Sequence, residues 1–70
     1  SGAVRVRVGR QLVVENDLAL ARRVLAPVLF SPHGDSDDAL AEIARLFDEK
    51  APPETILAAM DKAWSEDADD

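Results

Sequence analysis

The stretch Val4-Arg5-Val6-Arg7-Val8 decides the fold that this sequence predicts. Apolar and charged residues alternate along it and every apolar residue is β-branched, which is typical of a strand with one buried face. A second apolar segment, residues 12–15, follows as a return strand. A three-residue loop over 9–11 places most of the apolar side chains on one face and the charged ones on the other. The sequence therefore predicts an N-terminal β-hairpin over about residues 4–15.

Three helices are predicted after this hairpin. Apolar residues recur at helical spacing over about residues 17–26, 36–50 and 53–65. The first helix is expected to end or kink near Leu25 or Ala26, because the proline at position 27 removes a hydrogen bond and clashes with the preceding turn. The short link between the last two helices predicts an antiparallel helical hairpin. The expected fold class is α+β, mainly helical.

The 70 residues suffice for one small domain, expected over residues 1–64. The acidic residues 65–70 oppose the dipole at the end of the last helix, and we expect them to form a disordered tail. Such a small core gives a thin stability margin, so association with a partner or with a second copy is expected. The predicted core consists of Val6, Val8, Val14, Leu18, Leu25, Leu40, Ile43, Phe47, Leu57 and Met60.

Charge is divided between the two parts of the chain. Residues 1–30 carry a net charge of +3 and residues 31–70 a net charge of −9, which together give the formal net charge of −6. A basic N-terminal part and an acidic helical part indicate two surfaces that suit different partners.

Several classes of function find no support in the composition. The chain has no cysteine, which excludes disulfides, thiolate catalysis and cysteine-ligated zinc. His33 is the single histidine, and one nitrogen ligand does not make a transition-metal site. No nucleophile motif and no glycine-rich phosphate loop occurs, so we expect neither an enzyme nor a cofactor. No apolar run is long enough to span a membrane, and we expect a cytoplasmic protein.

The main functional hypothesis is a non-enzymatic interaction module, such as an adaptor, an assembly factor or a docking domain. Met60 and Trp64 are one turn apart on the last predicted helix, where they either pack in the core or anchor a partner. Asp61 and Glu66 stand beside them in the sequence and would attract a basic protein. The acidic helical hairpin is thus the expected contact surface.

A second hypothesis rests on the N-terminal strand. The strand, a following helix, and Gly34-Asp35-Ser36 before the helix with Leu40 and Ile43 together resemble the ribbon–helix–helix repressors. The resemblance implies an intertwined homodimer whose paired strands enter the DNA major groove. By the same resemblance Arg5 and Arg7 read bases and Ser36 contacts a phosphate, while the acidic C-terminal part serves as an antitoxin-type tail.

This DNA-binding alternative, a dimeric repressor or antitoxin, also draws on Arg10 as a nucleic-acid contact. In a third interpretation the chain is part of a larger protein, where the strand completes a sheet. The sequence leaves open whether residues 4–8 pair within the chain or between two copies.

Overall fold

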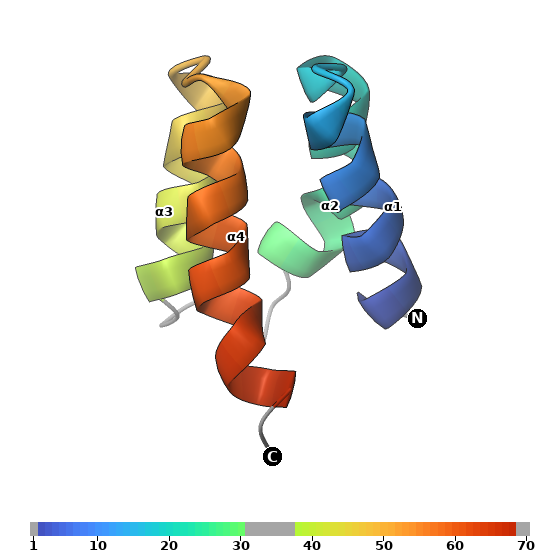
Figure 1. The fold of residues 1–70 in the computed structure, drawn as a ribbon, viewed down its shortest axis with the longest axis vertical. Helices are drawn as coiled ribbons and strands as arrows, with labels where there is room; N and C mark the ends of the chain where they lie inside the picture. Colours follow the sequence, from blue (N-terminus) through green and yellow to red (C-terminus); the bar gives the residue numbers. More distant parts are fainter. Residues whose placement is uncertain (1, 31–37, 69–70) are drawn as a thin grey trace.

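The computed structural model describes residues 2–30 and 38–68, with side chains described as far as Trp64. This part of the chain contains no strand and consists of four helices: α1 (Gly2–Val14), α2 (Leu18–Leu29), α3 (Asp38–Asp48) and α4 (Pro53–Ala68). The helices run alternately up and down (Figure 1), with α1 packed against α2 and α4, and α3 packed against the same two helices. The mainly helical part of the predicted fold is confirmed.

The predicted N-terminal β-hairpin is wrong, because residues 4–15 belong almost entirely to α1. Val6, Gly9 and Val13 are three and four residues apart, which aligns them on one side of a helix. Gly9 and Val13 are buried there against the other helices, and Val6 packs at the edge of the core. An isolated two-stranded hairpin is marginally stable in water, whereas α1 buries its apolar side in a four-helix core. Packing therefore overrides the strand propensity of the valines.

The helix predicted over 17–26 continues through Pro27 to Leu29, which is a second correction. Pro27 is exposed, so the disturbed turn faces solvent. The backbone N–H of Phe30 donates to the carbonyl of Ala26 at 2.9 Å, which continues the helical ladder past the proline. Burial of Leu29 in the core holds this last turn in place.

The turns that follow α1 and α3 have the same geometry. Asn16 has φ of 63° and Lys50 has φ of 56°, both in the left-handed region. The N–H of Asp17 donates to the carbonyl of Leu12 at 2.8 Å, and Asn16 N–H donates to Val13 at 2.9 Å. The N–H groups of residues 51 and 50 make the equivalent bonds to residues 46 and 47. Both turns are Schellman motifs, which reverse the chain sharply and set α2 and α4 beside α1 and α3.

One hydrophobic core joins all four helices. Its buried members are Val13, Ala21, Leu25, Leu29, Ile43, Leu46, Phe47, Ile56 and Met60. Four residues of the predicted core are among them: Leu25, Ile43, Phe47 and Met60. Four more are half-buried at its edge: Val6, Leu18, Leu40 and Leu57. The predicted burial of Val8 and Val14 is wrong, because a helix over α1 turns both side chains to solvent.

Candidate protein-interaction surface

The four residues predicted to bind a basic partner have different environments on α4. Met60 is 1% exposed and belongs to the core, so it offers no accessible surface. Trp64 is half-buried and packs against the same core. Asp61 is exposed, and its carboxylate is engaged by an arginine of α1. The side chain of Glu66 and residues 69–70 lie outside the described part of the chain. The α4 backbone is helical through Ala68, so the disordered tail stays a prediction for residues 69–70.

The ion pair between Arg10 and Asp61 joins the first helix to the last. Arg10 Nε donates to Asp61 Oδ1 at 3.0 Å and Arg10 Nη2 donates to Oδ2 at 3.2 Å, a bidentate arrangement. The side-chain hydrogen bond from Arg10 and its positive charge hold the pKa of Asp61 below the ordinary value of 3.8. Arg10, which was predicted as a DNA contact in the alternative hypothesis, therefore serves the fold.

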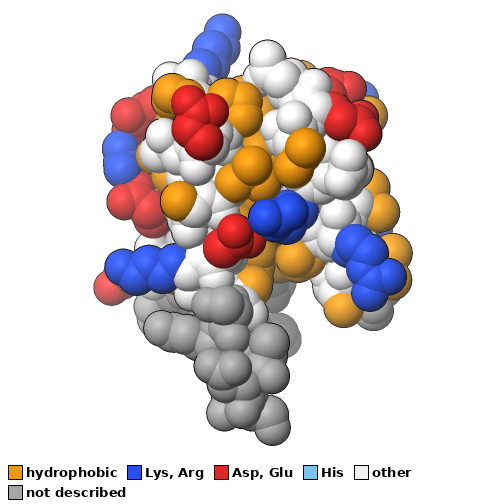
Figure 2. Space-filling model, in the orientation of Figure 1, with side chains coloured by type: hydrophobic (Ala, Val, Ile, Leu, Met, Phe, Trp, Pro, Cys, Tyr) orange, Lys and Arg blue, Asp and Glu red, His pale blue; other side chains and the backbone are white. Residues whose placement is uncertain are grey.

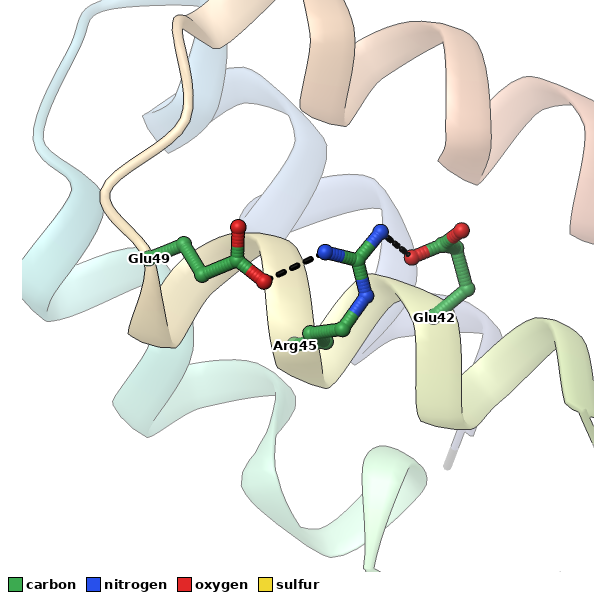
Figure 3. A network of polar contacts seen from close by, with 3 residues as sticks. All are labelled: Glu42, Arg45 and Glu49. Atoms are coloured by element: carbon green, nitrogen blue, oxygen red, sulfur yellow. Dashed lines mark hydrogen bonds and ion pairs between the residues drawn. The ribbon is translucent and has the colours of Figure 1, made fainter.

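Most carboxylates of α3 are also engaged by arginines. Arg45 donates to both Glu42 and Glu49 on the exposed side of α3 (Figure 3). These two carboxylates raise the pKa of Arg45, with the hydrogen bond to Glu49 as the main cause. Asp48 accepts a hydrogen bond from Arg22 Nε of α2 at 3.0 Å. The acidic helical hairpin thus presents fewer free carboxylates than its sequence indicates.

The arginines of the first two helices divide into two groups. Arg10 is paired with Asp61 of α4, and Arg22 is paired with Asp48 of α3. Arg7 and Arg23 are exposed and have no ion pair within residues 2–30 and 38–64. Arg5 donates from Nη1 to the backbone carbonyl of Val24 at 3.2 Å, which leaves its positive charge without a carboxylate. Three uncompensated positive charges therefore lie on α1 and α2.

Among the described residues, the large exposed apolar side chains lie on the same two helices or directly after α2. These residues and their exposed fractions are Val4 57%, Val8 45%, Val14 50%, Leu20 42% and Phe30 53%. Figure 2 shows hydrophobic and Lys or Arg side chains side by side over α1, at the right-hand edge of the molecule. Exposed apolar side chains and arginines thus lie next to each other on α1.

Three of these apolar residues lie on helices α1 and α2, which pack against each other: Val4 and Val8 of α1 and Leu20 of α2. Together with the half-buried Val24 of α2, we call them the outer α1–α2 face. Val4 and Val8 are one turn apart, as are Leu20 and Val24, so each pair lines one side of its helix. The bond from Arg5 Nη1 to the backbone carbonyl of Val24 joins α1 to α2 beside these residues.

Val14 and Phe30 lie apart from this face. Val14 follows Val8 by six residues, which turns its side chain well away around the helix. The ring of Phe30 is covered on one side by the guanidinium of Arg22, whose Cζ lies 5.2 Å from the ring centroid. Arg22 also binds Asp48, so its guanidinium links the Phe30 ring to α3.

The described surface holds two shallow hollows. One lies on α1 and is lined by Arg7, Val8, Arg10, Gln11 and Leu12. The other lies where α2 meets the turn after α3 and is lined by Asn16, Leu18, Ala19, Arg22, Phe47, Asp48 and Lys50. The first shares Val8 with the outer α1–α2 face.

The described residues contain no group of three or more side chains suited to hold a metal ion. Among the same residues, no helix combines the length and the apolar character needed to cross a membrane. Sequence reasoning missed the outer α1–α2 face because it placed the valines of residues 4–8 in the core. The recurrence of valine at positions 4 and 8, four residues apart, is the signal that indicates an outward stripe once residues 2–14 are helical.

Comparison of the chain with protein-family models, with curated proteins and with solved structures finds no match.

Proposed function

We propose that this protein is a non-enzymatic interaction module that binds another protein through the outer α1–α2 face. The observation that carries the proposal is that, within the described part of the chain, the exposed large apolar side chains all lie on α1, on α2 or at Phe30. Contact with a partner removes apolar surface from water, which is the dominant favourable term in protein association. Exposed apolar groups that lie together and are rimmed by polar residues are typical of such contacts.

Arginine beside an apolar surface fits the same interpretation. Arginine is enriched in protein interfaces, because its planar head makes several hydrogen bonds and its stem packs on apolar groups. Arg5, Arg7 and Arg23 border the outer α1–α2 face on its two helices. Association also supports a domain with a small core, since a partner that binds only the folded state stabilises it.

The structure offers less support for the two hypotheses drawn from the sequence. The predicted contact through the acidic hairpin would need Met60, which is buried, and Asp61, which is bound to Arg10. The ribbon–helix–helix interpretation needs a strand over residues 4–8, and those residues are helical. Its Ser36 lies outside the described residues. Both hypotheses therefore rest on less than the outer α1–α2 face does.

The test is a comparison of proteins captured from a lysate by three forms of the chain. Val8→Glu places a charge on the outer α1–α2 face, and Val14→Glu places the same charge on an equally exposed valine away from it. We expect a partner that the wild type and Val14→Glu both retain and that Val8→Glu loses. Retention of the same proteins by all three forms would contradict the proposed surface.

A further inference from the structure

We infer that the partner bound by the outer α1–α2 face is an acidic amphipathic helix, an inference that rests on the proposed function. The shape of the face supports a helix. Val4 and Val8 on α1 and Leu20 and Val24 on α2 form two short apolar rows along adjacent antiparallel helices. A third helix can lie along two helices packed in this way, with its apolar side chains at i, i+3 and i+4 spacing turned toward them.

The hollow beside Val8 adds a site for one of those side chains. Its lining includes Val8 and Leu12 as apolar groups and Arg7 and Gln11 as polar ones. An aliphatic side chain seated there contacts the two apolar groups, while an acidic residue one turn away on the same helix reaches Arg7. The hollow therefore favours a partner that alternates apolar and acidic residues along one side.

Charge determines the acidic character of the partner. Arg5, Arg7 and Arg23 are exposed and lack a carboxylate partner among the described residues. The two acids of residues 2–30, Glu15 and Asp17, lie in the turn between α1 and α2, where Glu15 accepts a hydrogen bond from Gln11 Nε2 at 3.1 Å. A partner with Asp or Glu beside its apolar stripe meets the positive charges of Arg5, Arg7 and Arg23, and like charges in a basic partner would oppose binding.

A second copy of this chain fits the face poorly. In a two-fold symmetric dimer the same patch contacts itself, which would bring the arginines of one copy toward those of the other. An anionic membrane is also disfavoured, because the whole chain carries a formal net charge of −6 and the face has no Trp or Phe to insert.

The experiment is a selection of displayed helical peptides on the full-length chain. Each peptide carries Leu at positions of one apolar stripe, and the flanking positions vary among Glu, Gln and Lys. We expect the selected peptides to be enriched in Glu at the flanks, to lose at least tenfold in affinity against Val8→Glu, and to bind Val14→Glu normally. Reversal of two free charges, Arg7→Glu with Arg23→Glu, should invert the preference toward Lys.

The other outcomes separate this inference from the proposed function. Enrichment of Lys or Gln in peptides that still depend on Val8 would overturn the acidic partner and leave the interaction surface intact. Selected peptides that bind Val8→Glu and the wild type equally would overturn both. Size-exclusion chromatography with light scattering measures self-association of the chain, and cosedimentation with vesicles rich in phosphatidylglycerol measures membrane binding. Self-association or vesicle binding that Val8→Glu abolishes, without any selected peptide, would also overturn both.

Discussion

The side chain of Leu25 occupies the space that a side chain at Gly9 would need. A Cβ built at Gly9 would lie 2.4 Å from Leu25 Cγ and 2.6 and 2.8 Å from its two Cδ atoms. Leu25 is fully buried, so it has no free space into which to turn. The absence of a side chain at Gly9 therefore sets how closely α1 and α2 approach each other.

We predict that Gly9→Ala destabilises the protein although alanine is the better helix former. Helix propensity favours alanine by about 1 kcal/mol, whereas overpacking of a tight core costs about 1–3 kcal/mol. The overlap at Gly9 is severe, so the net loss in the free energy of unfolding should be about 1–2 kcal/mol. Urea denaturation followed by circular dichroism measures it.

Gly2→Ala is the matched control for this substitution. Gly2 lies on the same helix, and a Cβ there meets nothing within 4 Å. It should leave stability unchanged or raise it slightly. If both alanine variants are equally stable, the close approach of α1 and α2 at Gly9 is contradicted.

Val13 and Val14 are neighbours in the sequence with opposite environments, 0% and 50% exposed. We predict that Val13→Ala costs about 2 kcal/mol, because two buried carbon atoms are lost and a cavity remains. Val14→Ala should change stability by less than about 0.5 kcal/mol. The predicted hairpin, in which Val14 faces inward, requires the reverse order, so thermal unfolding of the two variants distinguishes the two folds.

Lys50 adopts a left-handed backbone conformation that suits glycine better than lysine. A left-handed backbone costs an ordinary L-residue roughly 1–2 kcal/mol, and glycine at this position avoids that cost. The larger entropy of glycine in the unfolded chain offsets part of the resulting stabilisation. We predict that Lys50→Gly raises the free energy of unfolding by up to about 1 kcal/mol. Asn16→Gly should gain less, because asparagine tolerates this region. Equal or negative effects at both positions would contradict the turn geometry.

The Arg10–Asp61 pair predicts a particular dependence of stability on acid. The pKa of Asp61 is lowered in the folded protein, so its contribution is fully present above the ordinary value of 3.8. It is lost as the pH falls below that value and through the lowered pKa of the folded state. Asp61→Asn should therefore destabilise modestly at neutral pH and make little difference at about pH 2. Both side chains are about half exposed, so the effect should shrink in high salt.

The control for this prediction is the same substitution in an Arg10→Gln background. Without its guanidinium partner, Asp61→Asn should lose most of its effect at neutral pH. An unchanged effect would show that Asp61 acts through some other group.

The sequence predicted helices well where caps and prolines mark their ends. Pro53 opens α4, and the apolar spacing of Ile43 and Phe47 defines the buried side of α3. It failed at residues 4–8, because five alternating residues satisfy a strand period and, through Val4 and Val8, a helical one. The deciding information is non-local: Gly9 packs on Leu25, sixteen residues away.

The candidate site was missed for the same reason. Asp61 is expected from the sequence to attract a basic partner, whereas in the structure it binds Arg10, which lies 51 residues away and which no local pattern pairs with it. Once residues 4–8 are helical, Val4 and Val8 move from the expected core to an outward stripe. Because residues 4–8 were predicted as a strand, the contact surface was predicted on the helices now seen as α3 and α4 and not on α1 and α2.

The ion pairs between the helical pairs have a consequence for how the chain folds. Arg10–Asp61 and Arg22–Asp48 both join a base of the first pair to an acid of the second. The net charges of the two halves of the sequence have the same signs as these pairs, since residues 1–30 carry +3 and residues 31–70 carry −9. Two oppositely charged halves attract each other before any side chain packs, so the collapse of the unfolded chain is steered toward the correct partner surfaces. Added salt should therefore slow refolding more than it speeds unfolding.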